Sequence, residues 1–389
     1  MKRAPRGGLR RRRAPAAKAA RRAVAVAGGE DALLAWLRAR LGPPASGLLG
    51  DDAAMVRLAA RGSRGEEWAL TVDSQIEGTH FLPGLDPALV AARLLAVNFS
   101  DLAAVGAAPS LALLALAAPA GFDHRRFFRA LGEGCRRAGV TLAGGDLARA
   151  PQVVATMTLL GRRRPGGRWL RRDAGRAGDA LWVGGTLGES ALGRLLLARG
   201  AALQGRHVAL PAGLALGGTS AVAARRAVKR HLQPSPQLAL SAALARRRRC
   251  ACLDVSDGLA RDLSRLCAAS GVGATIEAAA LPLPRGAVAL AAALGADSLA
   301  LALGGGEDYV LLFALPPREA APAGCTRIGM LEARGGMRLR TAEGVASLPP
   351  RGWDHLAGER PPSTPTPQRT NERKPRPAVS QPGGAVSWT

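Results

Sequence analysis

The stretch Cys252-Leu-Asp-Val-Ser-Asp-Gly-Leu259 runs from an apolar segment through two aspartates and a glycine into a helix-like segment. Its pattern predicts a buried strand over 252–255 and a helix over 258–269. Working outward, we expect strands over 180–183, 309–315 and 326–330, and a helix over 189–198. Arginines 246–249 are expected to end a further helix, where the helix dipole favours cations. This alternation predicts an α/β domain over residues 161–356.

The preceding part of the chain predicts a separate α+β domain over residues 29–160. Strands are expected over 68–73, where the strand ends in an acid, and over 111–118 and 153–160. Helical spacing of apolar residues predicts helices over 31–41, 87–105 and 123–138. The turn-forming residues 163–167 mark the boundary between the two domains.

The two ends of the sequence differ from this middle in composition. Residues 1–28 carry ten Lys or Arg and no acid, and residues 357–389 carry five Lys or Arg, two acids and seven prolines. We expect both segments to be disordered. They hold +10 and +3 of the formal charge of +25, which leaves +12 for residues 29–356. No aromatic residue lies among the arginines of the leader, so we do not expect a specific nucleic-acid partner.

Composition and motifs exclude several classes of protein. The sequence contains no run of about 18 uncharged apolar residues, so it does not predict a membrane span. The phosphate-binding patterns GxxxxGK[ST] and GxGxxG are both absent, and Lys229 is the only lysine between the two ends. Five scattered cysteines predict a reducing compartment, hence a cytoplasmic protein, rather than a disulfide framework.

Acidic residues are placed unusually in this sequence. Several lie in Gly-, Ser- or Thr-containing turns at the ends of apolar segments rather than on solvated helix faces. Mg²⁺ prefers oxygen ligands and is commonly held by one or two carboxylates together with substrate phosphates. Because lysine is almost absent, acids converging from several turns would have to bind a polyphosphate through metal ions. Any one of these motifs alone is more often an ordinary turn or helix cap.

In their order along the chain, however, the motifs resemble those of the thiamine-phosphate kinase family. This family belongs to the ATP-binding superfamily of aminoimidazole ribonucleotide synthetase and selenophosphate synthetase. The resemblance spans about residues 30–356 and is carried by Gly50-Asp-Asp-Ala-Ala54, Thr71-Val-Asp-Ser-Gln-Ile-Glu-Gly-Thr-His-Phe81, Leu95-Ala-Val-Asn-Phe-Ser-Asp-Leu-Ala-Ala-Val-Gly-Ala107, Gly144-Gly-Asp146, Arg230-His-Leu-Gln-Pro-Ser-Pro236, Asp254-Val-Ser-Asp-Gly-Leu259, Ser270-Gly-Val-Gly-Ala274, Gly305-Gly-Glu-Asp-Tyr309 and Gly352-Trp-Asp-His355.

The resemblance implies a fold, an activity and a set of partners. The fold would be the two-domain architecture of aminoimidazole ribonucleotide synthetase. The activity would be ATP-dependent phosphorylation of thiamine monophosphate to thiamine diphosphate by direct transfer of the γ-phosphoryl group, with several Mg²⁺ ions. The chain would form a homodimer by pairing the sheets of its N-terminal domains, with ATP in the cleft between the domains of a protomer.

The resemblance also implies roles for individual residues. Metal ligands would be Asp52, Thr71, Val72, Asp73, Asp101, Asp146, Asp254 and Asp257, of which Asp101, Asp146 and Asp254 would be catalytic. Nucleotide contacts would come from Gly145, Asp146, Arg172 and Ser256. The residues facing thiamine phosphate would be His80, Glu307 and Trp353. The sequence departs from the family where Val72 replaces the usual threonine and where Leu147, not threonine, follows Gly-Gly-Asp.

Three kinds of alternative stay open at this stage, of which the first is a sister enzyme of the same superfamily, with two candidates. A selenophosphate synthetase would need a reactive Cys near its N-terminal glycine loop, and the first cysteine here is Cys135. A hydrogenase-maturation carbamoyl dehydratase is expected to end in cysteine, and this sequence ends Ser387-Trp-Thr389. A basic nucleic-acid-binding protein would be supported only by the charge, half of which lies in the two ends. An inactive scaffold is disfavoured by the intact set of acids.

Overall fold

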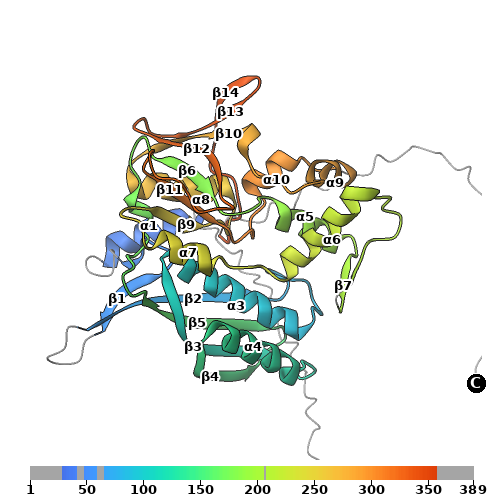
Figure 1. The fold of residues 1–389 in the computed structure, drawn as a ribbon. Coiled ribbons are helices and arrows are strands. Elements are labelled where there is room, and N and C mark those ends of the chain that lie inside the picture. The colour runs from blue at the N-terminus through green and yellow to red at the C-terminus, as the bar shows by residue number, and fades with distance from the viewer. Residues whose placement is uncertain (1–28, 42–47, 59–64, 206, 357–389) are drawn as a thin grey trace, which may run out of the picture.

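The computed structural model describes residues 29–41, 48–58, 65–205 and 207–356. The leader 1–28 and the tail 357–389 predicted to be disordered lie outside these ranges. The described residues form two large sheets, one from the first half of the chain and one from the second, with helices packed on and between them, and a small two-stranded sheet (Figure 1).

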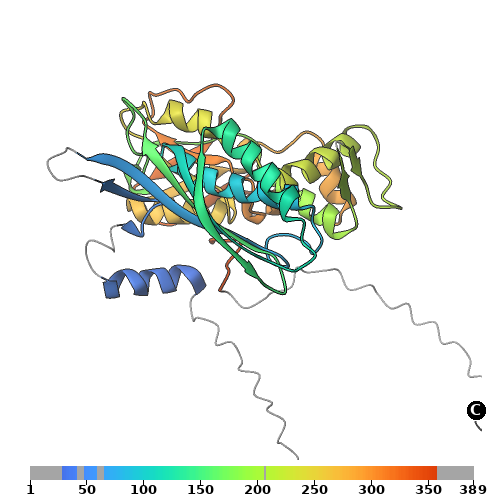
Figure 2. The same ribbon diagram turned by 90° about the horizontal axis from the view of Figure 1, so that it is seen from below.

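The N-terminal sheet has the strand order β1-β2-β5-β3-β4. Its strands are β1 (Ala54–Leu58), β2 (Glu66–Ile76), β3 (Ala107–Ala118), β4 (Thr141–Arg149) and β5 (Val154–Arg163). Neighbouring strands pair antiparallel except β3 and β4, which are parallel. In Figure 2 the sheet lies in front of the second domain.

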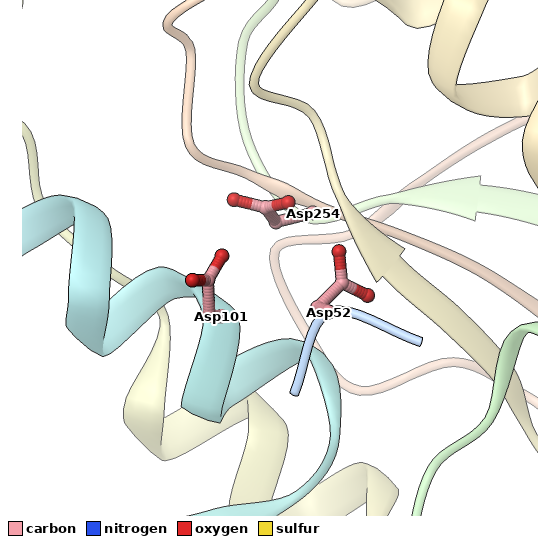
Figure 3. Close-up of side chains that lie close together, drawn as sticks. All are labelled: Asp52, Asp101 and Asp254. Atoms are coloured by element: carbon pink, nitrogen blue, oxygen red, sulfur yellow. The ribbon is translucent and has the colours of Figure 1, made fainter. Parts of the chain in front are cut away.

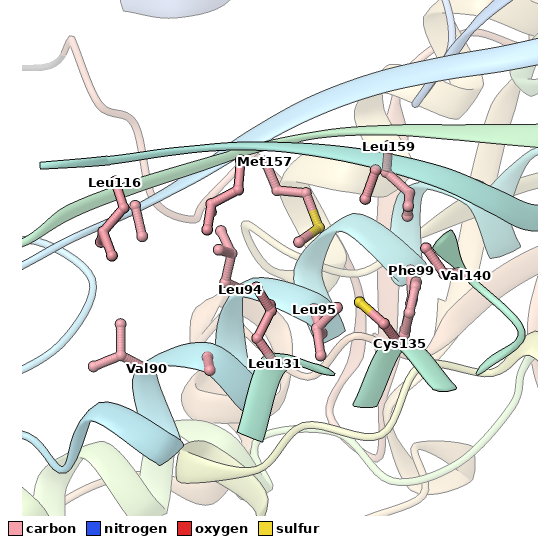
Figure 4. Close-up of a cluster of buried hydrophobic side chains, with 14 of the residues drawn as sticks. Val90, Leu94, Leu95, Phe99, Leu116, Leu131, Cys135, Val140, Met157 and Leu159 are labelled. Carbon is pink, nitrogen blue, oxygen red and sulfur yellow. The ribbon is translucent and has the colours of Figure 1, made fainter. Parts of the chain in front are cut away.

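Two helices cover one face of this sheet. They are α3 (Pro87–Ala104) and α4 (His124–Ala138). The Asp86 side chain accepts a hydrogen bond from the Ala88 amide at the start of α3, and Pro87 occupies its first turn, both typical of a helix start. Leu94, Leu131 and Met157 join the helices to the sheet in one apolar core (Figure 4). This core fixes α3, and with it Asp101 in the last turn of α3.

The C-terminal sheet has the strand order β14-β13-β10-β12-β6-β11-β9. Its strands are β6 (Ala180–Val183), β9 (Ala251–Asp254), β10 (Gly273–Glu277), β11 (Leu311–Leu315), β12 (Thr326–Glu332), β13 (Met337–Thr341) and β14 (Gly344–Ser347). The pairing is antiparallel except between β10 and β13. Alternation of strands and helices therefore produces a mixed sheet here rather than a parallel one.

The remaining elements lie outside the two large sheets. They are α1 (Gly29–Leu41), α5 (Glu189–Ala198), α6 (Gly218–Leu232), α7 (Leu238–Leu244), α8 (Leu259–Ser270), α9 (Ala287–Ala293), α10 (Ser298–Gly304), the hairpin β7 (Ala202–Gln204) and β8 (His207–Ala209), and the 3₁₀ turns η1 (Arg172–Ala174) and η2 (Ala278–Ala280). On one face of the C-terminal sheet, Leu263 of α8 packs in a core with Leu253 and Ile276. On the other, Phe313 packs with Ala103 and Ala104 of α3. The end of α3 is thus held against the second domain.

Three local predictions were wrong. Gly144-Gly145-Asp146 is not a turn but lies within β4, because a side chain at Gly145 would overlap the backbone of Leu114 on β3, and glycine lets the two strands pair. The strand that was expected to end at Asp73 continues to Ile76. The helix expected to end in arginines 246–249 ends at Leu244, and those arginines follow it in a turn.

By length and composition alone, α3 could cross a membrane, and the bent pair α9–α10 passes the same test if taken as one span. In α3, 78% of the apolar window is buried inside the protein. That burial is typical of a core helix, and α3 occupies such a position between the sheet and the second domain.

Candidate active site

Three aspartates from distant parts of the chain meet where the two domains join. Asp52 lies in the turn before β1, Asp101 in the last turn of α3 and Asp254 at the end of β9. One carboxylate oxygen of each lies within 4.8 Å of the others, and the three side chains point toward a common centre (Figure 3). The helix predicted over 87–105 likewise placed Asp101 near its end.

Neighbouring side chains orient these carboxylates. Thr71 of β2 donates a hydrogen bond of 2.5 Å to Asp101 Oδ2, and Ser100 donates one of 2.6 Å to Asp254 Oδ2. Arg172 binds both carboxylate oxygens of Asp52, with Nε 3.2 Å from Oδ2 and Nη2 2.5 Å from Oδ1. Each domain therefore contributes acids and the groups that hold them.

The electrostatics of the cluster favour a cation. Burial raises the pKa of Asp101 well above its ordinary value, and the charges of Asp254, Asp73 and Asp52 raise it further. Burial likewise raises the pKa of Asp254, with a further contribution from the charge of Asp52. An all-oxygen set of acids whose charges repel one another in a buried place suits a hard divalent ion such as Mg²⁺.

A fourth acid, Asp73 of β2, lies near this cluster and also near Asp257 and Glu307 of the second domain. Burial raises the pKa of Asp73 to about 6, and the charges of Asp257 and Glu307 add to the rise. The Ser74 amide, 2.7 Å from Asp73 Oδ1, and the nearby His355 act in the opposite direction. Arg265 Nη1 lies 2.7 Å from Asp257 Oδ2.

The turn that carries Ser256 and Asp257 is organised by a residue that sequence reasoning missed. Oδ2 of the buried Asp262 accepts hydrogen bonds from the amides of Ser256, Asp257 and Gly258 at 3.0–3.1 Å. Burial, with the charge of Asp257, raises the pKa of Asp262 to about 7. Its only sequence signal is an acid in the first turn of a helix, which is common for helices in general.

Glu307 is held in a strained turn by a second residue that sequence reasoning missed. Its φ of 57° is unusual for a residue with a side chain. Glu307 Oε1 accepts a hydrogen bond from Arg93, which is fully buried in α3. Arg93 also binds Gln75 Oε1 at 3.0 Å and the His80 carbonyl at 3.1 Å. Arg93 therefore holds together the elements that carry His80 and Glu307.

His80 and Trp353 both contact the ring of His355. The ring centres of His80 and His355 are 5.3 Å apart, and those of Trp353 and His355 are 5.5 Å apart. Burial and the His355 charge lower the pKa of His80. Trp353 donates a hydrogen bond from Nε1 to His355 Nδ1 at 3.1 Å, but it is 52% exposed, so it does not cap the core and part of its ring can contact a ligand.

The main chain around Trp353 is also held by hydrogen bonds. The Trp353 amide donates to the Asp257 carbonyl at 2.9 Å, and the buried Arg261 donates to the Trp353 carbonyl. The next residue, Asp354, accepts a hydrogen bond from the Glu30 amide at 3.2 Å and forms an ion pair with Arg261 at 3.1 Å. These contacts attach the start of α1 to the same edge of the site.

The structure does not bring Gly145 and Asp146 to this cluster within one protomer. β4 is three strands from β2, a separation of about 14 Å at the usual strand spacing. Because Asp146 pairs with Ala115 and, through β5, with Ser74, its side chain lies on the sheet face away from Asp73. Val72 shares that outer face and is 63% exposed.

Comparison with known proteins agrees with this architecture. Family models described as AIR synthase related protein match residues 50–162 for its N-terminal domain and residues 176–337 for its C-terminal domain. The thiamine-monophosphate kinase of Escherichia coli (strain K12) is 35% identical over 322 residues, covering 79% of this chain and 91% of that protein. The enzyme of the same name from Salmonella typhimurium (strain LT2) is 33% identical with the same coverage.

A solved structure described as AaThiL complexed with AMPPCP and TMP has a TM-score of 0.71 and 29% identity, covering 84% of this chain and 97% of that one. The resemblance found in the motifs and the two-domain architecture are thereby confirmed. The chain belongs to the thiamine-monophosphate kinase family, within the AIR synthase related proteins.

Proposed function

We propose that this protein phosphorylates thiamine monophosphate with ATP to form thiamine diphosphate and ADP. An oxygen of the substrate's phosphate attacks the γ-phosphorus of ATP, and the bond from that phosphorus to the β–γ bridging oxygen breaks. No nucleophilic side chain is needed, since the acceptor is the substrate itself. The observation that carries the proposal is the Asp52–Asp101–Asp254 cluster at the domain junction, next to the His80, Glu307 and Trp353 group.

In this proposal the acids hold Mg²⁺ and the neighbouring residues bind the two substrates. Asp52, Asp101 and Asp254 are the central metal ligands, and Thr71, Asp73 and Asp257 lie around them. When bound, Mg²⁺ neutralises phosphate charge as the phosphoryl group moves. Arg172, beside Asp52, and Ser256, in the turn after Asp254, face the nucleotide. Val72 offers no side-chain oxygen, so only its backbone carbonyl could ligate a metal.

Product analysis is the test of this function. Purified protein is incubated with Mg-ATP and thiamine monophosphate, and the products are separated by chromatography. We expect thiamine diphosphate and ADP in equal amounts, and none in a parallel sample to which excess EDTA is added. ADP without thiamine diphosphate would contradict the proposal, as would the absence of turnover with intact protein.

Trp353→Ala is expected to raise the KM for thiamine monophosphate about two- to thirtyfold, because an exposed indole can stack on the cationic thiazolium at a value of roughly 0.5–2 kcal/mol. The KM for ATP should barely change. Both constants and the melting temperature are measured on the same variant. Equal loss for both substrates together with a large fall in melting temperature would mean that Trp353 is structural.

We propose further that the protein is a homodimer whose N-terminal sheets face each other. Val72 and Leu113 lie on the outer face of the sheet, and are 63% and 46% exposed in the protomer. Asp146 lies on the same face, so its proposed metal contact and the nucleotide contact of Gly145 would be made at the dimer interface. The matching motifs of the family support this arrangement.

Leu113→Arg is therefore expected to convert the dimer to a monomer and to lower kinase activity with it, because a charge would be buried at the interface. Light scattering after size-exclusion chromatography gives the mass. Val288→Arg is the matched control, since Val288 is 62% exposed on α9, away from that face. A wild-type protein that is monomeric at micromolar concentration would contradict the dimer.

We also place the protein in the cytoplasm. All five cysteines are free thiols in the structure, and four of them are buried. Free thiols are typical of a reducing compartment.

A further inference from the structure

The motif Arg230-His-Leu-Gln-Pro-Ser-Pro236 has no role in the function proposed above. It covers the end of α6 and the loop that follows, and it faces the loop before α5. Between them lies a cavity of about 440 Å³ whose lining includes Thr186, Arg226, Lys229, Arg230 and Ser235. This cavity is distinct from the aspartate cluster, none of whose members lines it.

The charge of the cavity is positive and only partly compensated. Arg226 pairs with Glu189, the one acid in the lining, whose other oxygen accepts a 3.0 Å hydrogen bond from Thr186. The charges of Lys229 and Arg230 remain. Among the described residues, the Lys229 ammonium makes no ion pair or hydrogen bond. A net charge of about +2 is thus left facing the cavity.

Arg230 gives the stronger indication of a ligand. Its Nη2 donates to the Asp308 carbonyl at 2.6 Å, which fixes the guanidinium in place. Its Nε is buried and has no partner among the described residues. The Arg230 Nη1 makes no hydrogen bond among the described residues either and, unlike the buried Nε, is accessible to a ligand in the cavity that Arg230 lines. An oxyanion in the cavity would satisfy this donor and the Lys229 ammonium together.

The cavity is connected to the candidate active site through the turn that carries Glu307. Arg230 binds the carbonyl of Asp308, the residue next to Glu307. His231, the residue after Arg230, has its Nδ1 3.4 Å from Glu307 Oε2 and 3.0 Å from Ser190 Oγ. A ligand in the cavity would therefore contact Arg230, in the same segment as His231, which lies next to Glu307.

We propose that this cavity is a second anion site, which binds the phosphate or diphosphate group of a small phosphorylated molecule. Lys229, Arg230 and Ser235 supply charge-assisted and hydroxyl donors of the kind that bind phosphate oxygens. The site takes its ligand without Mg²⁺, because the one acid in its lining, Glu189, is paired with Arg226 and the remaining charges are cationic. The proposal does not rest on the proposed function.

Binding is tested by calorimetry with inorganic phosphate and with pyrophosphate, in EDTA to prevent metal-dependent binding at the aspartate cluster, and at ionic strength matched with chloride. We expect wild-type protein to bind pyrophosphate. Lys229→Gln and Arg230→Gln should each weaken that binding about tenfold, as for loss of one charged hydrogen bond. Arg129→Gln, a change of the same charge on the exposed face of α4, should have no effect.

The possible results separate the explanations. No binding of either anion to wild-type protein overturns the proposal, and so does an equal loss in Arg129→Gln, which would indicate general charge attraction. Lys229→Gln is the decisive variant if Arg230→Gln lowers the melting temperature, since Lys229 has no structural partner. Pyrophosphate binding with no phosphate binding indicates a diphosphate ligand, and binding of both indicates a single phosphate group.

Kinase assays on the same proteins keep this inference separate from the proposed function. Lys229→Gln should keep its rate at saturating substrates, since it touches none of the groups assigned to catalysis. If wild-type protein binds pyrophosphate but phosphorylates no thiamine monophosphate, the proposed function fails and the anion site stands. The reverse pattern overturns the anion site alone.

Discussion

Replacing Asp254 by Asn is expected to lower the rate of phosphoryl transfer by about a hundredfold or more, while the protein still folds. Asp254 is 3% exposed and lies with Asp52 and Asp101 around one centre. Loss of one carboxylate weakens the proposed metal contact that offsets phosphate charge in the transition state, and removal of a single preorganised electrostatic group costs a factor of this size. Asp101→Asn should behave in the same way.

The stability of the metal-free protein provides an independent readout of the same variant. Burial and neighbouring charges raise the pKa of Asp254 in the folded state above its ordinary value near 4. An acid shifted in this direction contributes stability at low pH that is lost as the pH rises. Metal-free wild-type protein should thus lose stability from about pH 4 upward, and Asp254→Asn should lose less.

Added Mg²⁺ should reverse the order of the two proteins. Ligands that bind only the folded state raise the melting temperature, so wild-type protein should gain from Mg²⁺ and Asp254→Asn should gain little. Glu133→Gln is the matched control, because Glu133 is 58% exposed on α4 and far from the cluster. An Asp254→Asn protein with a near-normal rate and a normal Mg²⁺ response would remove Asp254 from the metal site.

Much of the fold follows from local pattern alone. The apolar spacing of residues 87–105 predicted the helix Pro87–Ala104, and residues 189–198 predicted α5 at its observed bounds, because each buries one face against its own domain. β4 was not predicted because Gly144 and Gly145 were interpreted as a turn. In the structure these glycines allow β4 to pair closely with β3. The antiparallel pairing of the second sheet also depends on contacts that no local pattern encodes.

The candidate site was predicted in part. Asp52, Asp101 and Asp254 are about 50 and 150 residues apart, and only the resemblance to a family united them before the structure did. Arg93 gave no signal, since a single arginine among apolar helix residues usually reaches solvent. Asp262 gave only the weak signal of an acid in the first turn of a helix. Both act by supporting other site residues, through hydrogen bonds that depend on the tertiary fold rather than on a local pattern.

The contacts of Arg93 make it the residue whose loss should destabilise the protein most. It is completely buried and donates to Gln75, to the carbonyls of His80 and His231 and to Glu307. Removing one member of a buried ion pair leaves the other charged and unpaired, at a cost of about 3–5 kcal/mol. Arg93→Met, which keeps an apolar chain of similar length, should therefore lower the free energy of unfolding by about that amount in urea titrations.

An exposed arginine offers the matched control. Arg126 pairs with Asp86 at 2.5 Å, but its side chain is 52% exposed. Solvent screens such pairs, and their loss usually costs less than about 1 kcal/mol. Arg126→Met should accordingly change stability little. If Arg93→Met costs no more than Arg126→Met, Arg93 does not hold the site together.

A double-mutant cycle separates the ion pair from the other bonds that Arg93 makes. If most of the loss comes from the unpaired carboxylate, Glu307→Gln should restore part of the stability of Arg93→Met, because it removes the charge that was left buried. If most of it comes from Gln75 and the two carbonyls, the double variant should be at least as unstable as Arg93→Met. Restoration is the expected result, since Glu307 is the only charged acceptor among the four and sits in a turn that is strained even in the intact protein.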